Sequence, residues 1–229
     1  MTPAPSGRST ARGDATRQRI LDAAEQLYGA RGVDAVSLRE IRIVAGQRNT
    51  SALQFHFGDA AGLQLAIAQR HLPRVAEIQT RLWDQFRRDG REPEPSDLVA
   101  VLVGPYAEYL GRGASERAWV KIAAEGSARP ERVVDEFHQH APPVSLEVGA
   151  ALHGQLTVFL SPDLAVQRIM DVAVAALHLC ADRARAEERA IATRQPLPIG
   201  LDEWTGNLVD MATGAMLAPS RRHVHQPQS

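Results

Sequence analysis

The sequence predicts an all-α protein, with a three-helix head at the amino end and a larger helical body behind it. Apolar residues recur three and four positions apart along most of the 229 residues, which is the spacing of a helix face. No stretch shows the alternation of polar and apolar residues that indicates a strand. The segment 45–59, AGQRNTSALQFHFGD, carries many hydrogen-bonding side chains between two apolar helical stretches. A loop that only joins helices needs no such set, so this segment is a candidate site.

Composition indicates a soluble, cytoplasmic chain. With 44% hydrophobic residues, the chain is long enough to bury a sizeable core without covalent staples. Its single cysteine, Cys180, has no partner for an internal disulfide, and the amino end lacks the pattern of a secretory signal. The longest apolar runs, such as 172–177, fall far short of the roughly 20 residues of a membrane-spanning helix. We therefore expect no membrane contact.

Positive charge is concentrated at the amino end. Residues 1–57 contain eight arginines against five acidic residues, whereas the remainder contains 18 basic and 22 acidic residues. An excess of this size suits a nucleic-acid site only when the charges share one face, and otherwise it is a solvated surface. Composition alone leaves both interpretations open.

The amino end divides into an arm and a first helix. Residues 1–13, MTPAPSGRSTARG, offer almost nothing to bury and predict a disordered basic arm. From Thr16 the apolar positions follow helical spacing until Gly32, a residue suited to ending a helix. The first helix is therefore expected between these two residues.

A second helix follows, and its start is marked by a local signal. Ser37 and Glu40 have the spacing of a capping box, in which each side chain satisfies a free backbone N–H group at the helix start. The helix is expected to end at Gly46. Its expected apolar face consists of Leu38, Ile41, Val44 and Ala45.

After a short turn, a third helix is expected over 50–55. Asn49 is placed to cap it, because an Asn side chain accepts free N–H groups of the first turn. Leu53 and Phe57 lie four positions apart and are expected to enter the core. The side chains expected to point outward are Thr50, Ser51 and Gln54.

Two short helices joined by a glycine-containing turn form a helix-turn-helix, whose second helix enters the major groove of DNA. On that helix Gln54 can pair with N6 and N7 of adenine, while Ser and Thr reach base edges or backbone. Arg48 in the turn suits O6 and N7 of guanine or a phosphate. DNA contact thus explains the polar composition of 45–59, although any exposed helix is also polar on its outer side.

The order of these features closely resembles the amino-terminal domain of the TetR family of transcriptional regulators. The resemblance covers 16–70 and includes Ala45-Gly46 at the turn, His56-Phe57 at the end of the third helix, and Gly58-Asp59 before an apolar fourth helix. It implies a homodimer whose paired heads bind a palindromic operator in double-stranded DNA. It also implies a carboxyl-terminal domain that binds a small-molecule effector and then releases the DNA, most simply as a repressor.

The resemblance also implies roles for single residues. His56 matches the family's histidine, which implies a phosphate contact, with packing as the alternative. Phe55 matches an aromatic residue that either contacts a methyl group or sugar or packs in the head. Ser37 caps the second helix, and in this family that helix end also faces phosphate. The expected DNA-binding residues are therefore Ser37, Gln47, Arg48, Asn49, Thr50, Ser51, Gln54, Phe55 and His56.

The chain departs from the family pattern in three places. The turn contains Gln47 and Arg48, where one apolar residue is usual, and Gln54 stands where an aromatic residue is common. Both departures bear on base preference. Ala60 replaces the lysine that usually opens the fourth helix and touches a phosphate. Arg48 is a candidate to replace that backbone contact.

Helical spacing continues through the body, where Pro73 is expected to bend or break one helix and 104–105 to kink another. The expected helical stretches are 62–72, 75–88, 97–110, 115–125, 130–140, 145–155, 162–190 and 201–217. The expected domains are the arm 1–13, the helix-turn-helix domain 14–60, the ligand-binding and dimerisation domain 61–218 and a disordered tail 219–229.

The body is expected to bind an effector and a second copy of the chain. The stretches 162–190 and 201–217 resemble in position the family's dimer helices, although an ordinary core gives the same apolar stripe. Aromatic residues on the other body helices line either a cavity or the core. The candidate ligand contacts are Trp83, Phe86, Tyr106, Tyr109, Trp119, Phe137 and His178.

No cofactor, metal or catalytic activity is expected. The pairs His138 with His140 and His178 with Cys180 lie two positions apart, so on a helix their side chains point to different faces. No nucleophile, phosphate-binding or paired-carboxylate motif is present. The alternative function is a helical ligand-binding or interaction protein without specific DNA binding, and an enzyme that uses a body cavity ranks third.

Overall fold

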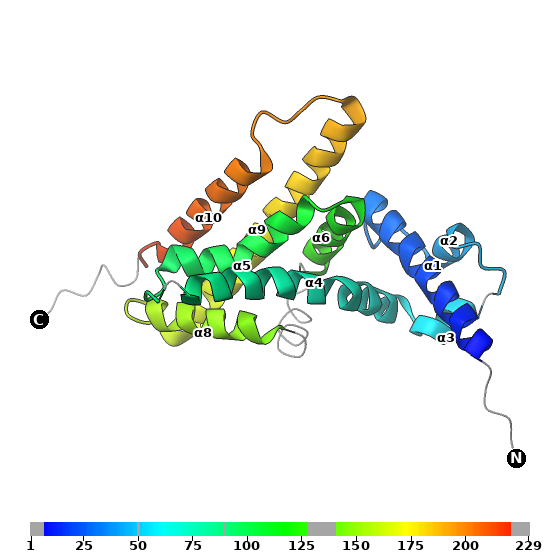
Figure 1. Cartoon of the computed structure of the whole chain (residues 1–229), viewed down its shortest axis with the longest axis horizontal. Coiled ribbons are helices and arrows are strands. Elements are labelled where there is room, and N and C mark those ends of the chain that lie inside the picture. Colours follow the sequence, from blue (N-terminus) through cyan, green and yellow to red (C-terminus); the bar gives the residue numbers. More distant parts are fainter. Residues whose placement is uncertain (1–6, 50, 89, 128–140, 221–229) are drawn as a thin grey trace, which may run out of the picture.

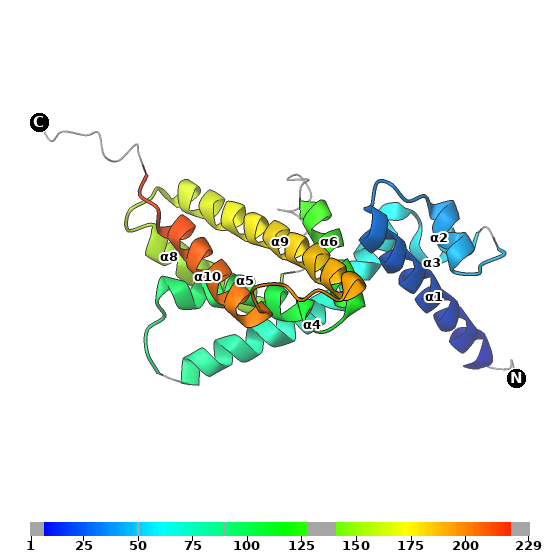
Figure 2. The same ribbon diagram turned by 90° about the horizontal axis from the view of Figure 1, so that it is seen from above.

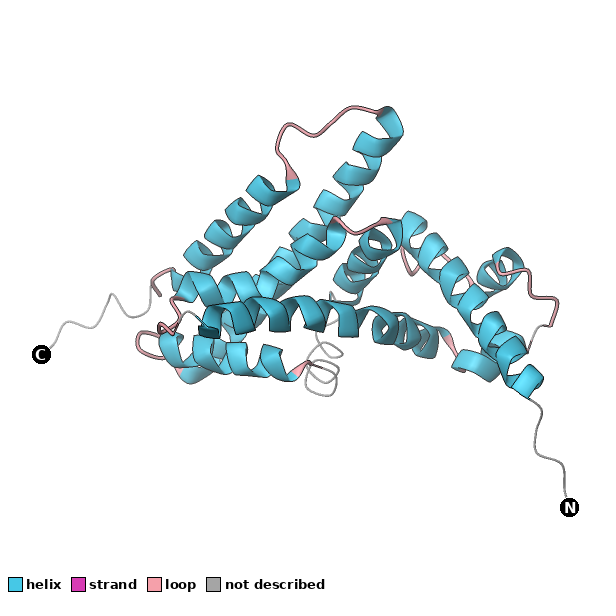
Figure 3. Cartoon of the chain, viewed as in Figure 1, coloured by secondary structure: helices cyan, strands magenta, loops and turns pink. Residues whose placement is uncertain are grey.

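The computed structural model of the chain describes residues 7–49, 51–88, 90–127 and 141–220. Across these residues the secondary structure is α-helical without strands, as the sequence predicts (Figure 3). The expected helix over 130–140, and Thr50 and Phe137 among the expected site residues, lie outside the described residues. The helices are α1 (Gly7–Arg31), α2 (Leu38–Val44), α3 (Ala52–Phe57), α4 (Ala60–Arg88), α5 (Pro95–Leu110), α6 (Ala114–Ser127), α8 (Pro143–Leu156), α9 (Pro162–Thr193) and α10 (Leu201–Leu217).

The helices form a small head and a larger body joined by α4 (Figure 1). The head consists of α1, α2 and α3, and α4 leads from it into the body, where it packs on α5, α6 and α8. Helix α5 also contacts α8, α9 and α10, so it is central to the body. Helices α9 and α10 lie side by side (Figure 2).

The capping box predicted at the start of α2 is present. Ser37 Oγ accepts the backbone N–H of Glu40 at 3.3 Å, and Glu40 Oε2 accepts the backbone N–H of Ser37 at 2.9 Å. Ile41 and Ala45 are buried, as expected, but Val44 is 52% exposed. The expectation for Val44 is wrong because α2 packs mainly on α1, so its buried stripe is narrow.

Helix α1 begins at Gly7, earlier than the sequence predicts. Residues 7–13 were expected in a disordered arm, and they form the first turns of this helix instead. The buried residues of 20–28 hold the rest of α1 in place, and extending an existing helix by a turn is easier than nucleating one. Residues 1–6 lie outside the described part of the chain.

Helix α4 continues through Pro73, so of the expected bend or break the break does not occur. A proline inside a helix costs about 3 kcal/mol, because it removes one hydrogen bond and crowds the preceding turn. Buried side chains on both sides of the proline, His71 and Val75, attach the two halves of α4 to the same core. Helix α5 likewise continues through Pro105. Packing with neighbouring helices thus outweighs the local preference.

Among the described residues one helix, α9, is long and apolar enough to cross a membrane by length and composition alone. A core helix of a soluble protein passes the same test. In this fold α9 packs along α5, α6, α8 and α10, which places it within the helical body.

Candidate nucleic-acid interface

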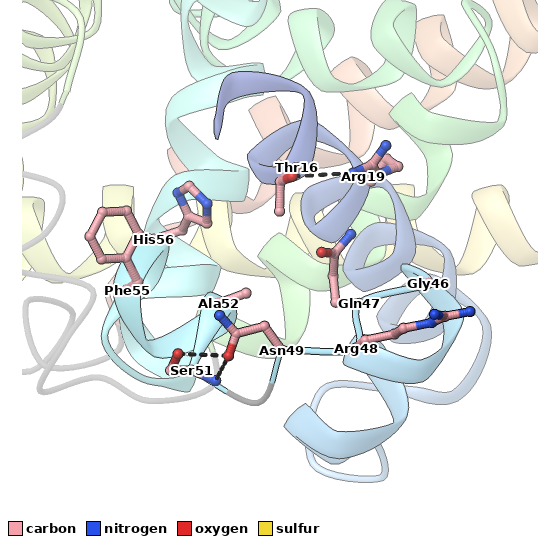
Figure 4. A pocket seen from close by; sticks show the side chains of 10 residues that line it. All are labelled: Thr16, Arg19, Gly46, Gln47, Arg48, Asn49, Ser51, Ala52, Phe55 and His56. Carbon is pink, nitrogen blue, oxygen red and sulfur yellow. Dashed lines mark hydrogen bonds between the residues drawn. The ribbon is translucent and has the colours of Figure 1, made fainter. Parts of the chain in front are cut away.

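The head contains an open polar cleft of about 590 Å³ between α1, the turn after α2, and α3 (Figure 4). It brings together six of the nine residues expected to contact DNA. Gln54 and Ser37 are outside its lining, and Thr50 is outside the described residues. The lining consists of Thr16, Arg19, Gly46, Gln47, Arg48, Asn49, Ser51, Ala52, Phe55 and His56.

Helix α3 is fixed by two residues on its inner side. Leu53 and Phe57 are 4% and 8% exposed, as their four-residue spacing predicts, and Arg17 of α1 lies over the Phe57 ring at 5.3 Å. The opposite side carries Gln54, which is exposed, and Phe55, which is 83% exposed. A large aromatic side chain in solvent is a feature that packing within the chain does not explain. The outer side of α3 is therefore a candidate contact surface.

Helix α3 begins at Ala52 rather than at Thr50, so the predicted start is wrong. Asn49 Oδ1 accepts the backbone N–H of Ser51 at 3.0 Å and the Ser51 hydroxyl at 2.8 Å. This local bond stabilises a turn ahead of the helix, because an Asn side chain competes with the helical hydrogen bonds for the same N–H groups. Asn49 thus orders the entry to α3 instead of capping its first turn.

The turn between α2 and α3 is braced by a residue that the sequence did not indicate, Arg42. Its Nη1 donates to the backbone carbonyls of Gln47 at 3.2 Å and Arg48 at 3.4 Å. Gly46 adopts a positive φ of 65°, and the Gln47 side chain donates back to the Ala45 carbonyl at 3.0 Å. The Gln47 amide nitrogen is therefore committed to the turn. Arg48 is exposed, and within the described ranges its guanidinium has no partner.

His56 stands at the edge of the cleft and is partly buried. Its ring meets the Phe55 ring edge-on, with centroids 5.1 Å apart, and tilts against the Phe57 ring at 6.1 Å. Phe55 and His56 both belong to the lining of the cleft, and in Figure 4 the His56 ring lies on the side of α3 that faces Thr16, whereas the Phe55 ring points away from the other lining side chains. Packing and DNA contact are thus compatible at His56, because the two neighbouring rings hold the imidazole without using its nitrogens.

The described lining of the cleft contains no acidic residue, and three acids of the head are paired with arginines outside the cleft. Asp22 and Glu25 accept hydrogen bonds from Arg70, and Glu40 pairs with Arg31. Hydrogen bonds from the Ser37 backbone and side chain, and then from Arg31, lower the pKa of Glu40 to about 2. The charge that remains in the cleft is that of Arg19 and Arg48.

Two cleft residues, Thr16 and Arg19, were not predicted from the sequence. Arg19 Nη2 donates to Thr16 Oγ1 at 3.1 Å, and both lie on α1 beside the turn (Figure 4). Their spacing of three positions puts them on one helix face, but only the tertiary fold shows that this face borders α3. Ser37 lies apart, with its hydroxyl donating to Glu40 Oε2 at 2.8 Å, so the side chain is used by the capping box.

A second hollow, of about 340 Å³, lies in the body between α5, α8 and α9. Of the expected ligand contacts, Tyr106 lines it, whereas the other described candidates do not. Trp83 and Phe86 stack on each other at 5.9 Å, and Trp119 and Tyr109 pack around His71. His178 is exposed. The part of the chain that the structure describes contains no group of three or more His, Cys, Asp or Glu residues able to hold a metal ion.

Comparison with known proteins gives a curated relative that matches part of the chain. No protein-family model matches the chain. Over 88 residues, 38% of this chain, it is 31% identical to the HTH-type transcriptional repressor AcnR of Corynebacterium glutamicum, and the match covers 46% of that protein. The chain thus spans about half the length of this curated relative.

Solved structures similar to the chain include GusR of Salmonella enterica, at 20% identity, with 89% of this chain and 96% of that chain covered and a TM-score of 0.44. They also include the TetR family protein CprB from S. coelicolor A3(2), at 23% identity, with 88% and 98% covered and a TM-score of 0.42. The order of motifs in the head, followed by a body that is helical throughout its described residues, resembles the TetR family of transcriptional regulators.

Proposed function

We propose that the chain is a ligand-responsive transcriptional regulator, most simply a repressor, that binds a palindromic DNA operator as a homodimer. The observation that carries the proposal is the cleft beside α3, whose described lining contains two arginines and no acidic residue. It lies next to the exposed outer side of a helix that Leu53 and Phe57 fix to the core. A recognition helix needs this combination of a rigid inner side and a polar outer side.

Each part of this surface suits a different part of DNA. Gln54 is exposed on α3 and reads adenine through N6 and N7. Phe55 contacts a thymine methyl group or a sugar, which accounts for its exposure. Arg48, Arg19 and His56 lie at the rim and contact phosphates, which position the protein without reading sequence. The side chains of Ser51, Asn49 and Gln47 remain candidate contacts, as do those of Ser37 and Thr50.

The dimer is proposed to form through α9 and α10. Only 22% of the most apolar stretch of α9 is buried within the chain, although its composition is that of a core helix. Leu179 on α9 is 40% exposed and Met211 on α10 is 54% exposed. A second copy of the chain covers such a surface when the two pairs of helices pack together. Exchange of Leu179 for Glu should give monomers in analytical ultracentrifugation, whereas Val158→Glu, in the exposed turn after α8, should leave the dimer intact.

Effector binding is proposed to act on the head through α6. Ser127 at the end of α6 lines the body cavity, while the same helix holds the head in three places. Ser115 Oγ donates to Glu25 at 2.7 Å, and Glu125 accepts the Val33 N–H at 2.7 Å. Gly29 of α1 approaches Ala118 so closely that an added Cβ would lie 2.5 Å from the Ala118 Cβ. Movement of α6 is therefore passed to α1.

The proposal is tested by DNA binding to the segment upstream of the chain's own gene. Fluorescence anisotropy should show tighter binding to this duplex than to a scrambled one. The affinity should fall by about a factor of ten or more between low and moderately high salt, because several phosphates are contacted. Equal affinity for both duplexes, or indifference to salt, would favour the alternative of a helical interaction protein without specific DNA binding.

Two substitutions separate base reading from backbone contact on the same duplexes. Gln54→Ala should cost about 1 to 3 kcal/mol on the operator and little on scrambled DNA, since a bidentate base contact carries discrimination. Arg48→Ala should weaken both complexes similarly and lower the salt slope by roughly one unit. Loss at a single operator position would instead assign Arg48 to guanine.

A further inference from the structure

The body cavity has a definite chemical character. It lies between α5, α8 and α9, with a volume of about 340 Å³, and the described residues of its lining include no Asp, Glu, Lys or Arg. The apolar part of the lining consists of Leu102, Val103, Leu146, Gly149, Ala150, Val166, Ile169, Met170, Ala173, Val174, Ala176 and Leu177. A charged ligand would lose its hydration there without gaining a counter-ion, so the lining disfavours ions of either sign.

Four polar side chains interrupt this apolar lining, and two of them are already committed. Ser145 Oγ donates to Gln79 Oε1 at 2.6 Å, and Ser127 Oγ donates to the Ala124 carbonyl at 2.8 Å. Tyr106 and His153 differ from them. Within the described residues, neither the Tyr106 hydroxyl nor the His153 ring has a hydrogen-bonding partner. A hydroxyl that has no partner in the described chain and lies on a cavity wall is available for a hydrogen bond to a ligand atom.

Tyr106 is a fixed and neutral donor. Its ring stacks on Trp119 at 6.0 Å, with the two planes 10° apart, which restricts the direction of the phenol. Burial, with a smaller effect of the nearby Cys180, raises the pKa of Tyr106, so the hydroxyl keeps its proton at neutral pH. A neutral O–H group in an apolar wall binds an uncharged acceptor well, since neither partner carries a charge to desolvate.

We propose that the cavity binds an uncharged, mainly apolar effector with a carbonyl or ether oxygen that accepts a hydrogen bond from Tyr106. This inference rests on the proposed function only in calling the ligand an effector. The cavity is at the small end of ligand sites and holds roughly 15 non-hydrogen atoms at the packing density of a protein interior. His153 offers a second polar contact on α8.

Three probes of similar size test the proposal on the full chain without DNA. They are octanophenone, the hydrocarbon octylbenzene and the anion 4-heptylbenzoate. Calorimetric titration should show that the ketone binds about five to ten times more tightly than the hydrocarbon, the gain expected from one neutral hydrogen bond. The anion should bind more weakly than either. Tyr106→Phe should remove the advantage of the ketone and leave the affinity for octylbenzene unchanged.

Two glycines on α8 provide a matched pair for blocking the site. Gly149 lines the cavity and Gly154 does not, and an added Cβ meets nothing within 4 Å at either position. Gly149→Leu should therefore abolish binding of both uncharged probes, while Gly154→Leu should bind them as the unmodified chain does. The proposal is wrong if 4-heptylbenzoate binds as tightly as octanophenone, if Tyr106→Phe keeps the preference for the ketone, or if Gly149→Leu still binds both.

Failure of this inference is distinguishable from failure of the proposed function. The titrations need no DNA, so they report on the cavity even if the chain binds no operator. Release of DNA by octanophenone is measured separately by anisotropy. Binding of the ketone without release supports the cavity assignment and overturns the coupling through α6, whereas specific DNA binding without any ketone binding overturns the cavity assignment alone.

Discussion

Two tyrosines on α5, three positions apart, have opposite surroundings. The hydroxyl of Tyr109 lies 2.6 Å from His71 Nδ1 in a buried cluster at the junction of head and body. The hydroxyl of Tyr106 has no partner among the described residues and belongs to the cavity. Both rings pack against Trp119, Tyr109 edge-on at 5.5 Å and Tyr106 stacked at 6.0 Å. The Trp119 indole therefore lies between a cluster whose polar groups are paired and a cavity in which the Tyr106 hydroxyl has no partner among the described residues.

In the junction cluster every polar group is paired. His71 Nε2 lies 2.9 Å from Glu25 Oε1, which also accepts from Arg70 at 2.9 Å, and Ser115 donates to the other Glu25 oxygen at 2.7 Å. Both ring nitrogens of His71 are therefore used, Nε2 with Glu25 and Nδ1 with Tyr109. Such a cluster fixes α1 against α4, α5 and α6. In the junction, buried polar groups that pair with one another hold the head in position. In the cavity, a hydroxyl without a partner in the described chain is instead available to select a ligand.

Of the substitutions that test this contrast, removal of the Glu25 side chain should have the largest effect on the free energy of unfolding. Glu25 is 4% exposed and His71 is 2% exposed, so Glu25→Ala leaves buried donors without an acceptor. We expect the free energy of unfolding in urea to fall by about 3 kcal/mol, as when one partner of a buried ion pair is removed. Asp22→Ala is the matched control, because Asp22 binds the same Arg70 but is 66% exposed. It should cost less than about 1 kcal/mol. Equal losses in the two variants would show that burial of the cluster is unimportant.

A second test compares the same substitution at the two tyrosines, and we expect a smaller loss of stability than for Glu25→Ala. Tyr109→Phe should lower the free energy of unfolding by about 1 to 2 kcal/mol, because it removes the partner of the buried His71 nitrogen. Tyr106→Phe should change it by less than about 0.5 kcal/mol, since no bond within the chain is lost. Burial raises the pKa of Tyr109 to about 12, so its hydroxyl stays protonated throughout the pH range of the measurement. Similar losses for both variants would mean that the Tyr106 hydroxyl is paired after all.

Local features were predictable from the sequence. The Ser37–Glu40 capping box and the inward pair Leu53 and Phe57 depend on spacings of three and four residues, and the structure contains both. The same reasoning did not predict that α4 continues through Pro73. A proline disfavours the interior of a helix, but packing against neighbouring helices keeps α4 continuous. Short-range pattern thus specified the head more completely than the body.

The junction cluster and the cavity were not predictable for a different reason. Glu25 and His71 are 46 positions apart, so no local spacing relates them. The aromatic residues chosen as ligand contacts are mostly those that fill the core, such as Trp119, whereas the cavity is lined by aliphatic side chains. A cavity exists where side chains leave space, which depends on several helices at once. Tyr106 was chosen together with the other aromatic residues, and no local pattern distinguished it from Tyr109.

Acid provides the mildest test of the contrast between the two regions, because it removes one charge from the junction and none from the cavity lining. Burial alone would raise the pKa of Glu25, but hydrogen bonds from His71 and Ser115, with the charges of His71 and Arg70, lower it below its ordinary value of 4.5. The contribution of Glu25 to stability is thus fully present above that value and is lost as the pH falls through the lower folded-state pKa.

The measurement is the free energy of unfolding of the unmodified chain minus that of Glu25→Gln, taken at several pH values from neutral down through the acid range. Other carboxyl groups, including Glu40, titrate in both proteins and cancel in the difference. The unmodified chain should be the more stable above the ordinary pKa of Glu25, and its advantage should shrink as the pH falls, because glutamine does not titrate. Tyr106→Phe, compared in the same way, should show no such trend. An advantage that grows on acidification would mean that the Glu25 carboxyl is held protonated in the folded chain, and the junction would then be fixed by neutral hydrogen bonds instead of by charge.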